Sequence, residues 1–315
     1  MKDKSAINLR KSMSRGSKEH ETKVSEHEGD VMTLAKKEVI SVPPSTTIKE
    51  VAEVMIDHKF RRLPVTDPGS EKLLGIVTAM DILNFLGGGD KFNIMEEKYQ
   101  DNFLAAINES VREIMTREVK FMSHKDSIND CISLMLETEI GALPIVDDND
   151  KLVGIITERD FALALAGVLT DELVEDYMTT DVLTTTPGTP IEGVSKIMVR
   201  NRLRRVPIIG KAKEDTAVHG EIEELEGIVT SNDVLKFLGD NKLFTKLESN
   251  SGAEVLDTKI SEIMEENVTS VEPLTRLGDL CEVFIENDIG GAPVIKNGEL
   301  LGIITESDIL KAIHK

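Results

Sequence analysis

The sequence has no tryptophan, and aromatic residues make up only 3% of its 315 residues. Hydrophobic residues still reach 40%, so packed cores are possible but must be built mainly from Ile, Val, Leu and Met. Cysteine is equally scarce: Cys131 and Cys281 stand alone, without the Cys-x-x-Cys spacing of a zinc site. The two thiols therefore predict small core residues, no disulfide framework and a reducing, cytoplasmic location.

Basic residues and long apolar runs are also lacking. Against 57 Asp and Glu there are 37 Lys and Arg, giving a net charge of −20. This balance argues against nucleic acid as a partner, because phosphate backbones are bound by a surplus of positive charge. The longest apolar run, 161–169, is about half a membrane span, and residues 1–30 lack the apolar segment of a signal peptide. We expect a soluble protein that binds neither nucleic acid nor membrane.

Catalytic and metal-binding patterns are missing as well. The six histidines are scattered without metal-ligand spacing. The acidic turn at 146–150 resembles a calcium loop only in part, because it lacks the glycine and the distal glutamate of that motif. We therefore expect no metal site and no enzymatic activity.

A short motif, Gly-apolar-apolar-Thr-x-x-Asp, is present four times at intervals of roughly 75 residues, which identifies a repeat. Its glycines are Gly75, Gly154, Gly227 and Gly302. A second anchor, proline followed by apolar residues, precedes each copy at Pro64, Pro144, Pro207 and Pro293. The third repeat is longer between its two anchors, and its acidic insertion at 210–226 predicts a solvated loop.

Each repeat predicts the order strand, helix, strand, strand, helix. In the first repeat these elements are expected at 39–42, 48–56, 63–66, 73–77 and 81–85, with Thr46 as the N-cap of the first helix. The first strands of the later repeats are expected at 119–122, 182–185 and 268–271. The predicted organisation is a flexible tail at 1–28, motif 1 at 29–90, a linker helix at 91–109, motif 2 at 110–168, motif 3 at 169–240, a linker at 241–257 and motif 4 at 258–315.

The odd and even repeats differ just before the proline anchor. Motifs 1 and 3 place two arginines there, at 61–62 and 204–205, whereas motifs 2 and 4 have small residues at 141–142 and 290–291. The unit of duplication is therefore a pair of motifs, and the chain holds two pairs in tandem.

This arrangement resembles the CBS motif, the regulatory repeat named after cystathionine beta-synthase. Two CBS motifs form a CBS pair, or Bateman module, and the resemblance covers about 31–313. It implies an α/β fold of two pseudo-twofold pairs with helices packed across each axis. It also implies that clefts between paired motifs bind adenosine compounds such as AMP, ADP, ATP or S-adenosylmethionine.

The Thr-x-x-Asp ending can act in two ways. A threonine at a strand end and an aspartate three residues later form a helix-capping box, which explains the pattern without any ligand. It does not explain the arginine pairs, whose planar guanidinium groups suit phosphate, although surface ion pairs with the many acids are the alternative. We expect the carboxylates to accept ribose hydroxyls: Asp81, Asp160, Asp233 and Asp308. The expected phosphate ligands, aided by nearby amides, are Thr78, Thr157, Thr230, Thr305, Arg61, Arg62, Arg204 and Arg205.

The adenine base needs an apolar slot, and the first two strands of each repeat offer one. The candidates are Ile40, Ser41, Leu63, Val65, Leu183, Thr184, Val206, Ile208 and Ser270. Motif 2 departs from the pattern, because Phe121 stands where the other repeats have serine or threonine and could fill the slot.

The function expected from this resemblance is non-enzymatic sensing of adenine nucleotides for an unidentified partner protein. Two alternatives stay open: a module that binds S-adenosylmethionine or a metal-nucleotide, and a structural assembly unit without ligand. A homodimer is also open.

Overall fold

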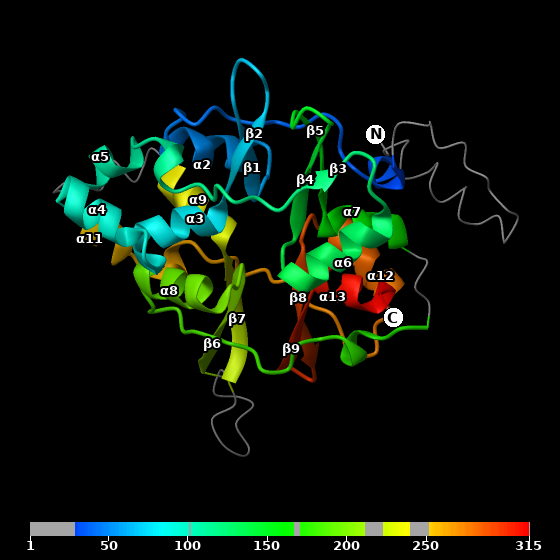
Figure 1. Ribbon diagram of the computed structural model, residues 1–315. Coiled ribbons are helices and arrows are strands. Elements are labelled where there is room, and N and C mark those ends of the chain that lie inside the picture. Colours follow the sequence, from blue (N-terminus) through cyan, green and yellow to red (C-terminus); the bar gives the residue numbers. More distant parts are fainter. Residues whose placement is uncertain (1–28, 101, 167–170, 212–222, 240–251, 315) are drawn as a thin grey trace, which may run out of the picture. The chain divides into compact units, whose positions relative to one another are not determined.

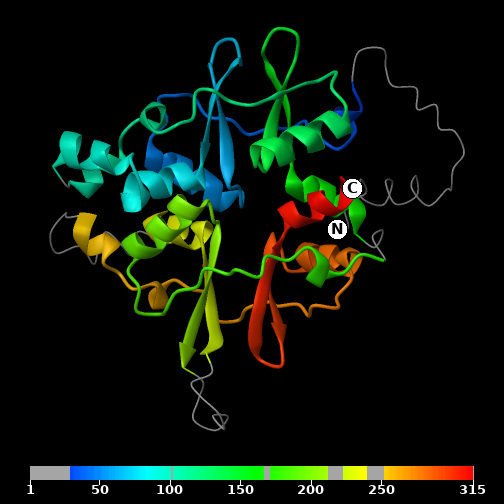
Figure 2. The same ribbon diagram turned by 60° about the horizontal axis from the view of Figure 1, so that its bottom comes forward.

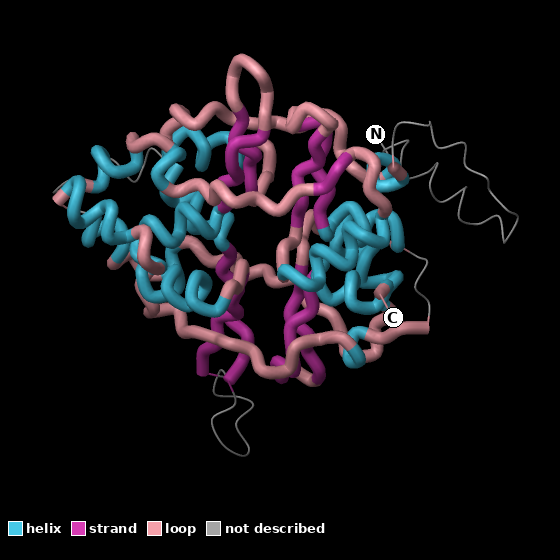
Figure 3. The backbone as a smooth tube through the Cα atoms, viewed as in Figure 1, coloured by secondary structure: helices cyan, strands magenta, loops and turns pink. Residues whose placement is uncertain are grey.

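The computed structural model describes residues 29–100, 102–166, 171–211, 223–239 and 252–314. The predicted tail at 1–28 and most of the acidic insertion lie outside these residues. The predicted mixture of helices and strands is confirmed, and each motif contributes one antiparallel hairpin (Figure 3).

The hairpins share one register. They are β1 (Arg62–Thr66) with β2 (Leu73–Thr78), β4 (Ala142–Val146) with β5 (Leu152–Thr157), β6 (Arg205–Lys211) with β7 (Glu223–Thr230), and β8 (Gly291–Lys296) with β9 (Glu299–Thr305). In each hairpin the motif threonine pairs with the first residue of the earlier strand, so Arg62 lies opposite Thr78 and Arg205 opposite Thr230. The corresponding partners in motifs 2 and 4 are Ala142 and Gly291.

The predicted first strands are much shorter than expected. In motif 2 the strand is β3 (Met122–Ser123), which pairs parallel with β4. In the other motifs one residue makes the contact: Val42 pairs with Val65, Thr185 with Ile208 and Val271 with Val294, all parallel. In motifs 1, 3 and 4, each predicted first strand is therefore a segment that crosses the hairpin and pairs with it at one residue.

The helices of the four motifs are α2 (Ile48–Asp57), α3 (Ala79–Leu83), α6 (Ile128–Thr138), α7 (Glu158–Leu165), α8 (Ile191–Asn201), α9 (Ser231–Gly239), α12 (Leu277–Glu286) and α13 (Glu306–Ile313). Six of these eight helices begin at a serine or threonine cap, whereas α8 and α12 follow Pro190 and Arg276, which make no side-chain cap. The cap of α2 is Thr47, one residue after the predicted Thr46, because its hydroxyl accepts from the N–H of Glu50 while the Glu50 carboxylate accepts from Thr47. A π-helical turn, η2 (Asn84–Gly88), continues α3. Single 3-10 turns are η1 (Asp30–Thr33), η3 (Val111–Glu113), η4 (Val174–Asp176) and η5 (Ile260–Glu262).

The segment between motifs 1 and 2 forms two helices rather than the single linker helix predicted. They are α4 (Phe92–Tyr99) and α5 (Phe103–Ile107). Gln100 has a positive φ of 49°, and Asn102 caps α5 by accepting from the N–H of Ala105. In the linker before motif 4, the described part contains α11 (Gly252–Leu256).

The described chain divides into two compact units that do not follow the order of the motifs. Unit 1 takes 29–39, 120–181 and 269–314, and unit 2 takes 40–119 and 182–268, apart from the undescribed residues. Unit 2 thus joins motif 1 to motif 3, and unit 1 joins motif 2 to motif 4. The sequence did not predict these groupings.

Unit 2 is built around one continuous apolar cluster. Helices α2 and α3 of motif 1 pack beside α8 and α9 of motif 3 (Figures 1 and 2). Phe103 of the linker and Leu256 of α11 belong to the same cluster as Met55 and Met198. The linker helices therefore complete the core of this unit, which explains why they are apolar on one side.

Unit 1 buries charge as well as apolar surface. Its helices α7 and α13 pack together, and its apolar residues form two clusters among the described residues. Glu158 and Glu306, the first residues of these helices, are 4% and 2% exposed. Arg159 places Nη2 2.6 Å from Asp288 Oδ1 and Nη1 3.6 Å from Glu306 Oε1, and Ser307 donates to Glu158.

Consecutive motifs exchange their leading segments. Lys36, in the leading segment of motif 1, bridges to Ile155 of motif 2, and Thr116, in the leading segment of motif 2, bridges to Ile76 of motif 1. The same exchange joins Thr179 to Ile303 and Glu265 to Ile228. The chain therefore passes from one unit to the other before each first strand.

Candidate functional site

All four Thr-x-x-Asp endings form capping boxes at the start of the closing helices α3, α7, α9 and α13. In motif 1, Asp81 Oδ2 accepts from the Thr78 N–H at 2.8 Å and from the Thr78 hydroxyl at 2.7 Å. The same two bonds are 2.6–2.9 Å long in the other three motifs. The hydroxyl thus donates its one proton to the carboxylate, so the threonine can donate to a phosphate only after that bond breaks.

The second carboxylate oxygen, Oδ1, faces a lysine in every motif. Lys91 lies 2.5 Å from Asp81, Lys36 3.7 Å from Asp160, Lys236 3.6 Å from Asp233 and Lys311 2.7 Å from Asp308. Two of these cations follow the aspartate by three residues on the same helix, while Lys91 and Lys36 come from distant segments. Sequence reasoning missed all four, although the i,i+3 spacing of Lys236 and Lys311 could have indicated them.

The four aspartate side chains are more buried than charged side chains usually are. The Asp160 and Asp308 side chains are 6% and 5% exposed, and those of Asp81 and Asp233 are 12% and 16% exposed. A carboxylate in such a position must keep hydrogen-bond donors around it, because burying an isolated charge is costly. A ligand that approaches Oδ1 must therefore bring donors of its own.

The arginine pairs lie beside two of the capping boxes. All four residues are half-buried and interact with other parts of the protein: Arg61, Arg62, Arg204 and Arg205. The N–H of Ala79 donates to the Arg61 carbonyl, and the N–H of Ser231 donates to the Arg204 carbonyl, both at 2.9 Å. The backbone before each hairpin therefore already occupies the first amide of the closing helix. Few helix amides are left for an anion, so side chains would have to supply most donors to a phosphate.

The candidates for the base site separate into core and surface residues. Leu63, Val65, Val206 and Ile208 have no exposed surface and belong to the unit 2 core. Their assignment as base-lining residues is not supported, because strand alternation shows that a side is buried but not whether protein or ligand covers it. The candidates with accessible surface are Ile40, Ser41, Leu183, Thr184 and Ser270.

Among those surface candidates, two are apolar: Ile40 is 37% exposed and Leu183 is 45% exposed. Both stand at the same position of the first strand, two residues before the bridge to the hairpin. Phe121, the residue that distinguishes motif 2, is 50% exposed, so its ring does not fill a slot in the core.

Known proteins match these repeats closely. The CBS domain family matches residues 29–88, 111–167, 174–240 and 260–315. This chain is a CBS-domain protein. Its four CBS motifs confirm the resemblance stated from the Thr-x-x-Asp repeats, and four CBS domains account for most of the chain.

Several relatives match most of the chain. Protein MJ1225 of Methanocaldococcus jannaschii is 39% identical over 284 residues, which covers 89% of this chain and 98% of that protein. Its crystal structure, for which homology to g-AMPK has been proposed, matches with a TM-score of 0.82 over 90% of this chain and 99% of that chain. A 33.4 kDa protein encoded in the ribosomal RNA operon of Thermofilum pendens is 29% identical over 87% of each chain. A Pyrococcus horikoshii structure shares the fold, with 20% identity, 90% and 99% coverage and a TM-score of 0.55.

Metal-binding groups, membrane-spanning helices and reactive thiols were the other features to consider among the described residues. They contain no group of three or more His, Cys, Asp and Glu that could hold a metal ion, and no helix among them is long and apolar enough to cross a membrane. Cys131 and Cys281 are buried in the cores, and burial raises the pKa of each thiol to about 12. These thiols stay protonated near pH 7 and are poor nucleophiles.

Proposed function

We propose that the chain is a non-enzymatic cytoplasmic sensor of adenine nucleotides, AMP, ADP or ATP, that reports its ligand state to a partner protein. The observation that carries the proposal is the repeated carboxylate at the helix start. Each one has Oδ2 fixed by the capping threonine and Oδ1 directed to a lysine.

A ribose fits such a carboxylate because its two neighbouring hydroxyls are hydrogen-bond donors. In motif 4, Lys311 is 57% exposed and can turn toward water, which leaves Oδ1 of Asp308 to the sugar. Lys236 beside Asp233 is 65% exposed and can do the same. The capping bonds to Oδ2 are kept, so ribose binding does not unravel the helix.

The phosphate is assigned to the arginines of motifs 1 and 3. Arg62 and Arg205 stand opposite the capping threonines, at the same end of the hairpin as the carboxylate. Both arginines already have partners in the protein, and an anion there would compete with interactions of their side chains. Arginine is suited to the exchange, because its fork binds phosphate with two parallel hydrogen bonds.

A sensor also needs two states that bind the ligand differently. Each motif threonine begins a closing helix, and these helices pack motif 1 against motif 3 and motif 2 against motif 4. Bound ligand would therefore act on the helices that hold each unit together. The similarity to MJ1225 supports a regulatory role, since homology of that protein to g-AMPK has been proposed.

The test is thermal unfolding with AMP, ADP, ATP and S-adenosylmethionine, together with mass spectrometry of small molecules released from protein purified without added ligand. A ligand at a hundredfold its Kd should stabilise the fold by roughly 2.7 kcal/mol. Replacing Arg204 and Arg205 by alanine should weaken AMP binding at least about tenfold, since charge-assisted bonds to phosphate are lost. Exposed Arg200→Ala is the matched control for the single variants Arg204→Ala and Arg205→Ala, because each of the three removes one positive charge from motif 3.

S-adenosylmethionine is the second candidate, and motifs 2 and 4 favour it more than motifs 1 and 3. They have Ala142 and Gly291 where the others have arginine, so they suit a ligand without phosphate. Its binding should not change in the Arg204→Ala/Arg205→Ala variant. Absence of any shift with all four compounds would contradict both candidates and leave an assembly unit.

A further inference from the structure

Lys91 differs from the other three lysines in how firmly it is held. Its side chain is 26% exposed, whereas those of Lys36, Lys236 and Lys311 are 53%, 65% and 57% exposed. Exposed lysines exchange a carboxylate for water at little cost, because surface ion pairs contribute only about 0–1 kcal/mol. A half-buried ammonium has less water available, so it depends more on its protein partners.

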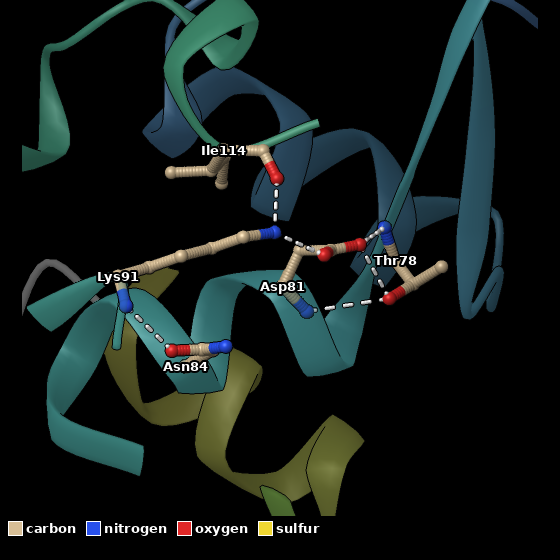
Figure 4. A network of polar contacts seen from close by, with 5 residues as sticks. All are labelled: Thr78, Asp81, Asn84, Lys91 and Ile114. Carbon is tan, nitrogen blue, oxygen red and sulfur yellow. Dashed lines mark hydrogen bonds and ion pairs between the residues drawn. The ribbon is translucent and has the colours of Figure 1, made fainter. Parts of the chain in front are cut away.

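Three hydrogen bonds fix Lys91 in the site (Figure 4). Its ammonium group donates to Asp81 Oδ1 at 2.5 Å and also to the backbone carbonyl of Ile114. Its backbone N–H donates to the side-chain carbonyl of Asn84 at 2.9 Å. The lysine thereby ties together α3, the start of α4 and the segment that leads into motif 2.

The glycines before Lys91 let the chain turn back toward Asp81. Gly87 has φ of 119°, a conformation that other residues rarely adopt. A Cβ at Gly88 would lie 2.5 Å from Val199 Cγ2 of α8. The glycines at 87–89 therefore permit both the reversal of the chain after η2 and its close contact with motif 3.

With Lys91 in place, both oxygens of Asp81 are occupied. Oδ2 accepts twice from Thr78, and Oδ1 accepts from the ammonium. A ribose would have to share Oδ1 with the half-buried ammonium or displace it, and displacement would also break the lysine's bond to Ile114. In motif 3, by contrast, Lys236 lies 3.6 Å from Asp233 and is mostly in water.

We propose that Lys91 is an internal occupant of the Asp81 carboxylate, so that this carboxylate stays closed to ribose while those of Asp160, Asp233 and Asp308 are open. This proposal rests on the proposed function, because it concerns the same ribose-binding carboxylates. The four carboxylates are then unequal: three can accept a ribose, whereas Asp81 of motif 1 holds the linker.

The test counts bound AMP per chain by native mass spectrometry and measures affinities by calorimetry. The variants are Asp81→Asn, Asp160→Asn, Asp233→Asn and Asp308→Asn, each in the wild type and in Lys91→Met. In the wild type, Asp81→Asn should leave the AMP count and Kd unchanged, whereas at least one of the other three should lower the count. Lys91→Met should add a binding event or tighten one at least about tenfold, and Asp81→Asn should abolish that gain. Lys311→Met is the control, because it removes an exposed lysine from an open carboxylate.

The proposal is overturned if Asp81→Asn lowers AMP binding to the wild type, or if Lys91→Met gains nothing. Should Lys91→Met fail to fold, the Asp81→Asn measurement in the wild type still decides the question, because it leaves Lys91 in place. If AMP, ADP, ATP and S-adenosylmethionine all fail to bind to the wild type and to every variant, the proposed function itself is wrong. Binding that depends on Asp81 in the wild type instead contradicts only the closure by Lys91.

Discussion

In unit 2 the closing helices α3 and α9 begin with Ala79 and Ser231, whereas in unit 1 α7 and α13 begin with Glu158 and Glu306. All four residues are at most 4% exposed. The same topology therefore places small side chains at one helix contact and two carboxylates at the other. In unit 1 the Glu306 carboxylate is paired with Arg159, a residue that no other motif has at that position, and the Glu158 carboxylate accepts from Ser307.

The apolar cores of the two units also differ. In unit 2 a single cluster runs through motif 1, motif 3 and the linker helices, whereas the described residues of unit 1 form two clusters. Unit 2 should therefore respond as a whole to a core defect. Unit 1 should respond more locally, and it should depend on charge pairing.

Phe103→Ala in unit 2 and Phe284→Ala in unit 1 should have the largest effects. Both side chains are at most 2% exposed, and removing such a ring costs about 3–5 kcal/mol. Amide hydrogen exchange should show loss of protection in both motif 1 and motif 3 for Phe103→Ala. For Phe284→Ala the loss should spare α6, whose buried residues belong to the other cluster. Equal spreading in both units would remove the distinction between the cores.

Arg159→Met should destabilise unit 1 by about 2–3 kcal/mol, because it leaves the buried Glu306 without its cation. Met80 is the residue at this position in motif 1, so methionine is compatible with the helix. Adding Glu306→Ser, which copies Ser231 of motif 3, should recover much of the loss. Denaturant unfolding of the single and double variants tests this, and additive losses would show that the two residues are not coupled.

Loss of the capping hydroxyl should cost more in unit 1 than in unit 2. Thr305→Val removes a donor from Asp308, whose side chain is 5% exposed, and should cost about 2 kcal/mol. Thr78→Val should cost about 1 kcal/mol, because Asp81 is more exposed than Asp308 and its lysine, Lys91, is less exposed to water than Lys311. The free energies of unfolding of the two valine variants give the comparison, and a larger loss for Thr78→Val would reverse it.

A pH effect is expected in the linker of unit 2. Hydrogen bonds donated by Lys98 and Tyr99 lower the pKa of Glu109 from 4.5 to about 2. A carboxyl with a lowered pKa stabilises the fold above its ordinary pKa, and this contribution is lost as the pH falls from about 4.5 toward 2. The stability difference between wild type and Glu109→Gln should therefore shrink over that range in unfolding curves. A difference that is constant with pH would show that Glu109 acts through packing alone.

The repeats could be predicted from the sequence, because the proline anchor lies in the first strand of each hairpin and Thr-x-x-Asp begins at the end of the second. The grouping of motif 1 with motif 3 could not be predicted, since apolar periodicity shows which face of a helix is buried but not which element covers that face. For the same reason Leu63 and Val206 were assigned to a ligand surface although they lie in the core. The contacts of Lys91 and Lys36 were missed because they join segments that are distant in sequence.

Calorimetry with AMP and its 2′,3′-dideoxy analogue tests ribose recognition most directly. Nucleotide sensing through these carboxylates predicts that the wild type binds AMP at least about tenfold more tightly than the analogue, because the analogue lacks both donors to the carboxylate. The Asp160→Asn/Asp233→Asn/Asp308→Asn variant should lose that preference. Equal affinity of the wild type for the two compounds would contradict a role of these aspartates in ribose binding.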